Sequence, residues 1–233
     1  MKILVSWSSG KDSAWMLYVL RSTQAPVSGL LTTVNEEADR VAMHGVRTSV
    51  LRAQAAAVGL PLTTIPLPHP CSNEIYEDRM AGCVRAAVAE GFTHVAFGDL
   101  FLEDVRRYRE DRLEGSGLQP LFPLWGRPTD ALAREMIDGG LEARLSCVDP
   151  RALDRGFAGR SFNRSLLDAL PPGVDPCGER GEFHTCVLGG PMFSRGIQVV
   201  PGEVVERDGF VFADFRPAEA GLYDANSTPR TRR

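Results

Sequence analysis

The first 125 residues alternate between short apolar runs and longer segments whose apolar residues recur every three or four positions. The apolar runs have the length of buried strands, and the recurring positions are typical of amphipathic helices. Strongly apolar strands that alternate with helices indicate a parallel sheet with helices on both faces. We therefore predict a five-stranded parallel, Rossmann-like α/β sheet. Its strands are expected at residues 2–6, 27–34, 60–67, 93–97 and 118–124.

The same pattern predicts two helices that contain charged or histidine side chains. A helix is expected to be led by residues 43–47, and another spans the densely charged residues 103–114. For most of the charged segment we favour a solvated helix with pairs four residues apart, such as Glu103 with Arg107. The alternative is that some of its arginines face the strand ends and meet a phosphate or a carboxylate.

The pattern changes at about residue 126, which predicts a second, smaller α+β lobe over residues 126–217 after a first domain of residues 1–125. Residues 218–233 are rich in Ala, Ser, Thr, Pro and Arg and are expected to form a flexible tail. In the second lobe, strands are expected at 141–148, 197–200, 203–207 and 210–215, and a polar helical stretch at 157–172.

The composition limits the classes of function. The chain has 233 residues, of which 43% are hydrophobic and 24% charged, and its net charge is −4. This balance argues against broad nucleic-acid binding. No apolar run approaches the length of a membrane span, and the N-terminus lacks a signal-peptide pattern, so a cytoplasmic location is expected. The five cysteines contain no Cys-x-x-Cys pair, which predicts reduced thiols rather than a zinc site.

Residues 8–13, Ser-Ser-Gly-Lys-Asp-Ser, join the first strand to the first helix, and we call them the serine loop. Backbone N–H groups at a helix N-terminus attract anions, and the hydroxyls and Lys11 add donors and charge. A Walker loop is excluded, because Asp12 follows Lys11 and Val5 stands where that motif needs glycine. The plainer alternative is an ordinary strand-to-helix turn with an aspartate cap. We favour a phosphate site made of Ser8, Ser9, Gly10, Lys11, Asp12 and Ser13, with Asp12 as a candidate ligand of Mg²⁺.

A second segment with candidate chemistry is Cys-Gly-Glu-Arg-Gly-Glu-Phe-His-Thr at residues 177–185. Its carboxylates and imidazole could bind magnesium or transfer protons, and its glycines permit tight turns near a ligand. An acidic surface turn with a solvated His184 is the alternative. The candidate catalytic residues here are Glu179, Glu182 and His184.

The serine loop resembles the S-G-G-x-D-S pyrophosphate loop (PP loop) of the N-type ATP pyrophosphatases, with Ser9 in place of a glycine. Further matches identify the chain as similar to the diphthine–ammonia ligase family over about residues 1–215. They are Met43–Arg47, Gly98-Asp99, Tyr108–Arg112, Pro123–Trp125 and Gly178–Thr185, in the family's order. The resemblance implies a HUP-type ATP pyrophosphatase domain followed by a family-specific substrate lobe.

The resemblance also implies an activity. Members of the family amidate diphthine on elongation factor 2: ATP and Mg²⁺ activate a carboxylate as an acyl-adenylate, and ammonia displaces AMP. The implied enzyme is an AMP-forming carboxylate–amine ligase whose partners are a small-molecule or protein carboxylate and ammonia, and a homodimer is possible. Arg180 replaces a family glycine, so the acceptor can differ from diphthine.

The resemblance assigns roles to individual positions of this chain. The serine loop would hold pyrophosphate. The adenosine would be lined or flanked by Thr33, His44, Gly98 and Asp99. The acceptor side would be formed by Arg112, Glu179, Glu182, His184 and Thr185.

Two other functions are compatible with a pyrophosphate loop. One is a tRNA-thiolating enzyme, for which Cys71, Cys83 and Cys186 could supply thiols, although the missing Cys-x-x-Cys and the acidic net charge count against it. The other is a non-catalytic ATP sensor of the universal-stress type, in which residues 178–185 would have no task.

Overall fold

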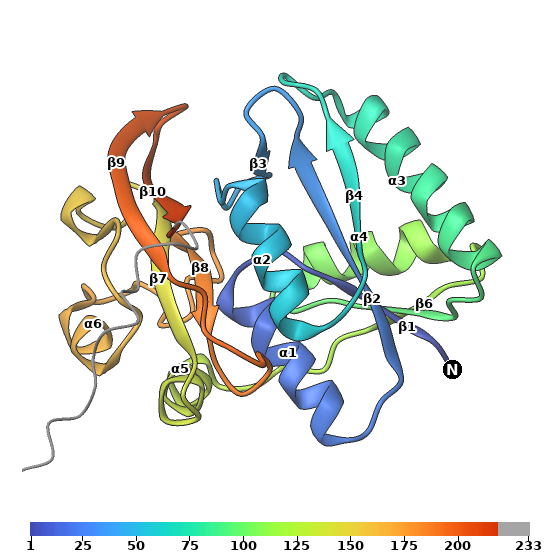
Figure 1. The fold of residues 1–233 in the computed structure, drawn as a ribbon, viewed down its shortest axis with the longest axis horizontal. Helices are drawn as coiled ribbons and strands as arrows, with labels where there is room; N and C mark the ends of the chain where they lie inside the picture. Colours follow the sequence, from blue (N-terminus) through green and yellow to red (C-terminus); the bar gives the residue numbers. More distant parts are fainter. Residues whose placement is uncertain (219–233) are drawn as a thin grey trace, which may run out of the picture.

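The computed structural model describes residues 1–218, and its two β-sheets are shown in Figure 1. The tail predicted for residues 218–233 lies, apart from residue 218, outside the described residues. Within residues 1–218, no helix is both long enough and apolar enough to cross a membrane.

The first sheet has six strands in the order β3-β2-β1-β5-β6, with β4 paired to β2. Five of them run parallel, as predicted, and the two-residue β3 is an antiparallel addition. The strands are β1 (Ile3–Ser6), β2 (Val27–Asn35), β3 (Arg40–Val41), β4 (Leu62–Leu67), β5 (His94–Ala96) and β6 (Gln119–Leu121).

Helices cover both faces of this sheet, which confirms the predicted α/β class. Alternate residues of β1 point to opposite faces, so Ile3 and Val5 pack with α1 and α2, whereas Leu4 belongs to a separate core beneath α3. The helices of this part are α1 (Lys11–Ser22), α2 (Thr48–Val58), α3 (Asn73–Ala89) and α4 (Glu103–Leu113).

The helix expected to be led by residues 43–47 begins only at Thr48. Residues 40–47 instead form β3 and a turn, in which Met43 and Gly45 have positive φ angles of 62° and 66°. Positive φ is incompatible with a right-handed helix. This turn lies at the carboxyl end of β2, next to the serine loop.

The second sheet is antiparallel, with four strands in the order β8-β7-β10-β9. Its strands are β7 (Glu142–Val148), β8 (Phe183–Gly189), β9 (Val199–Arg207) and β10 (Phe210–Pro217). The strand β8 was not predicted, and β9 is one strand where two were expected. The helical stretch predicted at 157–172 contains only α6 (Arg164–Ala169), preceded by a 3-10 turn at Arg155–Phe157.

The two sheets share one apolar core. The larger cluster of buried residues runs from Ile3 and Leu30 in the first sheet through α1, α2 and α5 (Thr129–Asp138) to Phe183 and Val211 in the second. Gln54 of α2, fully buried, ties them with polar contacts: its amide donates to the carbonyls of Ser9 at 3.2 Å and Val187 at 2.8 Å. As a result, β8 runs directly beside the serine loop.

Candidate functional site

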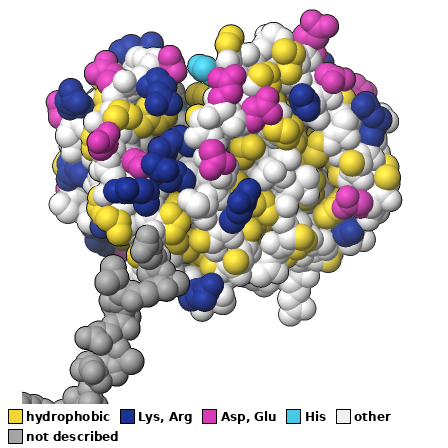
Figure 2. Space-filling view, turned by 45° about the horizontal axis from the view of Figure 1, so that its top comes forward, with side chains coloured by type: hydrophobic (Ala, Val, Ile, Leu, Met, Phe, Trp, Pro, Cys, Tyr) yellow, Lys and Arg dark blue, Asp and Glu magenta, His cyan; other side chains and the backbone are white. Residues whose placement is uncertain are grey.

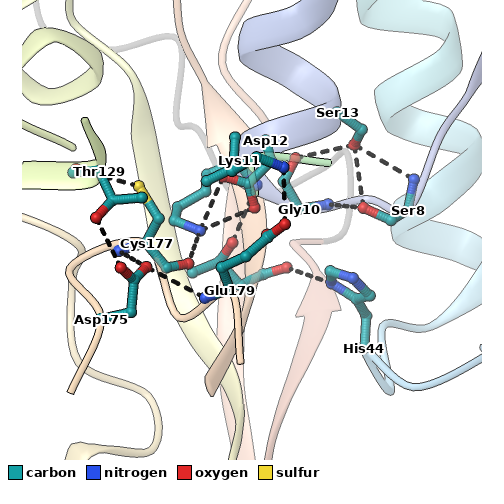
Figure 3. A network of polar contacts seen from close by, with 12 residues as sticks. Ser8, Gly10, Lys11, Asp12, Ser13, His44, Thr129, Asp175, Cys177 and Glu179 are labelled. Carbon is teal, nitrogen blue, oxygen red and sulfur yellow. Dashed lines mark hydrogen bonds and ion pairs between the residues drawn. The ribbon is translucent and has the colours of Figure 1, made fainter. Parts of the chain in front are cut away.

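The serine loop folds on itself where β1 passes into α1. The Ser8 and Ser13 hydroxyls are 3.1 Å apart, Ser13 also donates to the Gly10 carbonyl, and the Gly10 N–H donates to Ser8 (Figure 3). Gly10, which precedes α1, has no side chain to cap the helix, so its first N–H groups, apart from that of Lys11, end at this loop. The loop therefore has the form of an anion-binding helix N-terminus.

Ser9 is the residue that departs from the glycine of the pyrophosphate-loop pattern. Its φ is +69°, a conformation that glycine adopts freely and that costs serine some strain. The side chain is fully buried, and its hydroxyl has no hydrogen-bond partner among the described residues. Its carbonyl accepts from the Val187 N–H of β8 at 2.9 Å. Ser9 thus contacts β8.

A cavity of about 530 Å³ opens between the serine loop, the carboxyl ends of β1 and β2, the region after β5, and residues 177–185, and we call it the loop cavity. The structure brings most of the predicted site residues to its walls. They are Ser8, Lys11, Asp12, Ser13, Thr33, His44, Gly98, Asp99, Glu179, His184 and Thr185. Ser9, Gly10, Arg112 and Glu182 do not line it.

Lys11 is almost completely buried and points toward the second lobe. Its ammonium donates to the Asp12 carboxylate at 2.8 Å and to the Cys177 carbonyl, and it lies 5.5 Å from the centre of the Phe183 ring (Figure 3). Burial lowers the pKa of Lys11, but Asp12, Cys177 and Glu179 together outweigh it, and the pKa is raised overall. The charge of Lys11 therefore ties residues 175–179 to the serine loop.

Two neutral histidines stand on the cavity wall beside the serine loop. The His44 and His184 ring centres are 4.6 Å apart, and Nδ1 of His44 lies 3.1 Å from the Thr185 carbonyl oxygen. Burial lowers the pKa of His44 to about 4 and that of His184 to about 3, so both rings are uncharged at neutral pH. The Thr185 hydroxyl accepts from the Lys11 N–H at 3.0 Å. The end of the 177–185 segment is thus held against the serine loop.

The two glutamates of the 177–185 segment, Glu182 and Glu179, have different surroundings. Glu182 is buried, and its two carboxylate oxygens accept from the backbone N–H groups of Asp175 at 2.9 Å and Arg180 at 3.0 Å. Asp175 in turn accepts from the N–H groups of Cys177 and Glu179. These two carboxylates therefore fix the backbone of residues 175–182. Sequence analysis missed Asp175, whose only signal is an acidic residue before a glycine-rich turn.

Glu179 is the acid of this motif that faces the loop cavity. One of its oxygens accepts from the Leu100 N–H at 2.7 Å. Burial is the main cause that raises its pKa to about 7, and the nearby Asp12 carboxylate adds to the rise. A carboxyl group with a pKa near neutrality can both release and accept a proton under cellular conditions.

The charged helix α4 contributes an arginine to the site, but not the predicted one. Arg109 holds Asp99 in a two-point ion pair at 2.6 and 3.0 Å, stacks 4.3 Å from the Phe97 ring, and lines the loop cavity. Arg112 pairs instead with Glu77 of α3, away from the cavity. The expected pair of Glu103 with Arg107 is absent from the ion pairs of residues 1–218, where Arg106 pairs with Glu110 at 2.8 Å.

A magnesium site made by the protein alone is not present in residues 1–218, which contain no group of three or more His, Cys, Asp or Glu arranged to hold a metal. The Asp12 carboxylate lies on the cavity wall and is 24% exposed. That arrangement fits the usual way of binding Mg²⁺, in which one or two carboxylates and the phosphates of a substrate share the ion.

Two of the three cysteines named for a thiol mechanism, Cys83 and Cys186, have raised pKa values. Cys186 is fully buried in β8, and burial raises its thiol pKa to about 12. Cys83 is a half-buried residue of α3 that lines the loop cavity, and burial raises its pKa as well. A nucleophilic cysteine requires a lowered pKa.

Comparison with known proteins places the chain in a family. Residues 1–120 match the family described as "Diphthamide synthase N-terminal domain", and residues 128–214 match "Diphthamide synthase C-terminal domain". Among solved structures, a predicted subunit of a tRNA methyltransferase from Methanocaldococcus jannaschii is similar with a TM-score of 0.43 and 18% identity, covering 82% of this chain and 98% of that one.

Curated relatives extend over nearly the whole chain. The diphthine–ammonia ligase of Rattus norvegicus is 34% identical over 236 residues, covering 91% of this chain and 88% of its own. The human diphthine–ammonia ligase is 26% identical over 240 residues with the same coverage. That of Schizosaccharomyces pombe is 34% identical over 225 residues, which are 37% of its length. The chain therefore belongs to the diphthine–ammonia ligase family.

Proposed function

We propose that this ligase is ATP-dependent and AMP-forming: it activates a carboxylate as an acyl-adenylate, releases pyrophosphate, and then forms an amide with ammonia as AMP leaves. The observation that carries the proposal is the shared cavity. The serine loop and the Glu179–Thr185 segment come from different sheets, yet both line the same 530 Å³ space. One cavity can thus hold the phosphates and the reacting carboxylate together.

In this proposal the serine loop binds the β- and γ-phosphates. The Ser8 and Ser13 hydroxyls and the N-terminus of α1 offer donors and partial positive charge to an anion. Asp12 would hold Mg²⁺, which supplies charge neutralisation for the departing pyrophosphate. Gly98 permits the end of β5 to approach α1, because a Cβ there would lie 3.1 Å from the Ser13 nitrogen.

The adenosine is expected beside the ends of β2 and β5, where Thr33, Gly98 and Asp99 line the cavity. Asp99 is held in place by its two-point ion pair with Arg109. Ligands of parallel sheets bind at the carboxyl ends of the strands, in agreement with this placement.

The first chemical step needs no proton transfer. A carboxylate oxygen of the acceptor attacks the α-phosphorus of ATP, and the bond to pyrophosphate breaks. In the second step ammonia attacks the acyl carbon, the bond from that carbon to the phosphate oxygen breaks, and AMP leaves. The nitrogen must then lose a proton, and Glu179, with its pKa of about 7, is suited to receive it.

The acceptor is a carboxylate, and the names of the relatives make diphthine the first one to test. The test of the proposal is a product analysis with Mg-ATP, ammonium and a cell extract freed of small nucleotides, with a parallel sample containing diphthine. AMP with pyrophosphate is expected, and its formation should fall at least about a hundredfold in Asp12→Asn, because the phosphates lose their metal ligand.

The matched control is Asp104→Asn, which changes an exposed acid of α4 and should leave the rate unchanged. ADP and phosphate as products would contradict an AMP-forming ligase. ATP that binds without turnover in both samples would favour the sensor.

A further inference from the structure

A second cavity, of about 830 Å³, lies next to the loop cavity, and we call it the hairpin cavity. It is bounded on one side by the ends of β2 and β4 and the turn after β3, and on the other by the β9–β10 hairpin. Figure 2 shows the surface indented between the two lobes near the top of the view. Met43, Gly45 and His184 of the sequence motifs line this cavity, but the proposed mechanism does not use it.

The two cavities share a wall. Residues 41–43, Leu67 and His184 line both of them. His184 therefore stands where one space meets the other, with its ring 4.6 Å from that of His44 in the loop cavity. A molecule seated in the hairpin cavity is one side chain away from the reacting end of a nucleotide on the serine loop.

Large apolar side chains line the hairpin cavity on two opposite sides. Val205, Phe210 and Phe212 line it from the hairpin, and Met43 lines it from the opposite side. Met43 is 65% exposed and Val205 is 38% exposed. Large apolar side chains that remain open to solvent around a concave site are typical of a binding surface.

Two of the charged residues that line this cavity compensate each other. Arg40 and Asp214 line it and bind each other at 2.9 Å, and Arg47 binds the same carboxylate at 2.7 Å. Glu37, Arg207 and Asp208 lie at its exposed edge. The cavity is therefore suited to an apolar body whose polar end lies either at the mouth or at His184.

From this arrangement, and resting on the proposed function, we propose that the hairpin cavity binds the acceptor. The acceptor is a carboxylic acid with an apolar stem: the stem packs between Met43 and the β9–β10 hairpin, and the carboxyl group passes His184 to reach the nucleotide in the loop cavity. The wall formed by residues 41–43 and His184 then separates acceptor from nucleotide except at the reacting atoms.

Acylsulfamoyl adenosines test this arrangement without knowledge of the natural acceptor, because they imitate an acyl-adenylate and carry any chosen acyl group. Two probes are compared by calorimetry, one with an acetyl and one with a phenylbutanoyl group. The wild type should bind the phenylbutanoyl probe at least about tenfold more tightly, since its longer stem buries apolar area in the hairpin cavity.

The variant is Val205→Trp, which reduces the cavity from the hairpin side, and Ala38→Trp/Val205→Trp reduces it from both sides. The matched control is Val204→Trp: Val204 is the preceding residue of β9, is 47% exposed, and lines neither cavity. All of these positions lie outside the loop cavity, so affinity for ATP should be unchanged in each variant.

The proposal is supported if Val205→Trp loses most of the tenfold preference for the phenylbutanoyl probe and the double variant loses more. Val204→Trp should keep this preference. An advantage that survives in the double variant would overturn it, because the stem then lies elsewhere. Equal binding of both probes by the wild type would also overturn it. Failure to bind ATP and both probes would contradict the proposed function itself, and the acceptor site with it.

Discussion

At the scale of single residues, close contact between Gly10 and His44 shapes the serine loop. A Cβ built at Gly10 would lie 2.6 Å from Cε1 of His44 and 3.3 Å from the Thr185 carbonyl oxygen. His44 is itself fixed by Thr185, so it has little room to move away. The glycine is therefore required by packing, since its φ of −94° is one that any residue adopts.

Gly10→Ala should accordingly displace His44 and disturb the loop. We expect a loss of about 1–3 kcal/mol in the free energy of unfolding, as for an overpacked core, and a clear loss of ATP affinity. Urea denaturation and calorimetry measure the two effects. Gly82→Ala is the control, because a Cβ at this position of α3 meets only the end of Arg85 at 3.7 Å and alanine favours the helix. Unchanged ATP affinity in Gly10→Ala would refute the packing argument.

Glu179 gives a prediction about pH. Its folded-state pKa of about 7 lies above the ordinary 4.5, so the folded protein holds this proton more tightly than the unfolded chain does. Its contribution to stability is therefore present below about pH 4.5 and is lost as the pH rises to 7 and beyond. Glu179→Gln removes this dependence.

The variant should be more stable than the wild type at pH 8 by about 1 kcal/mol, a figure reduced to allow for the partial exposure of the side chain, and the difference should shrink toward pH 5. Urea denaturation at the two pH values measures it. Glu103→Gln, on exposed α4, is the control and should show no such trend. A variant that loses stability equally at both pH values would contradict the raised pKa.

Most of the site residues predicted from the sequence line the loop cavity, because they lie near glycines at strand ends. The sequence could not separate Glu179, which faces the cavity, from Glu182, which binds backbone N–H groups. Their directions depend on the turns at Gly178 and Gly181, whose φ angles are +67° and +86°. The resemblance assigned Arg112 to the site, whereas Arg109 is the arginine of α4 that lines the cavity; helical spacing alone does not show which side of α4 meets the strand ends.

At the scale of elements, the turn between β3 and α2 is held in place by β10. The Asp214 carboxylate of β10 accepts from Arg40 at 2.9 Å and from Arg47 at 2.8 and 2.7 Å. Arg40 also donates to the Gly45 carbonyl, and a Cβ on Gly45 would lie 2.6 Å from the Phe212 ring. Both ends of the turn that presents His44 are thus fixed by the second sheet.

Asp214→Ala should release this turn. The two arginines lose a shared partner that is only 13% exposed, so we expect a loss of about 2–3 kcal/mol in stability and several-fold weaker ATP binding. The same measurements, repeated with Asp214→Asn, should show a smaller loss because the amide still accepts one hydrogen bond. Glu206→Ala on exposed β9 is the control. Intact ATP affinity in Asp214→Ala would show that the turn does not depend on this ion pair.

Element prediction succeeded where the periodicity is local and failed where tertiary contacts decide. The five parallel strands follow from their apolar runs. The strand β8 was missed because its first residues belong to a glycine-rich acidic motif, although Cys186 and Val187 are fully buried between neighbouring elements. The late start of α2 depends on the turn between β3 and α2. Arg47 at the end of this turn binds Asp214, which lies 167 positions later in the sequence.

At the scale of the whole molecule, the site exists only because the two sheets share a core. Lys11 joins the serine loop to residues 175–179, Gln54 joins it to β8, and Asp214 joins the turn before α2 to β10. The hairpin cavity likewise has walls from residues 35–45 and 205–214. A local sequence pattern does not reveal a cavity between distant segments. The sequence therefore predicted the residues around the phosphates but not the cavity proposed for the stem of the acceptor.

If ATP activates the acceptor before ammonia reacts with it, the protein should catalyse pyrophosphate exchange in the absence of ammonium. The protein is incubated with Mg-ATP, radiolabelled pyrophosphate and the acceptor source, while ammonium is left out. The account predicts that label enters ATP under these conditions, that Asp12→Asn abolishes the exchange, and that added ammonium diverts the adenylate to amide and AMP. AMP that forms with ammonium, while no label enters ATP without it, would contradict an acyl-adenylate that forms on its own in the loop cavity.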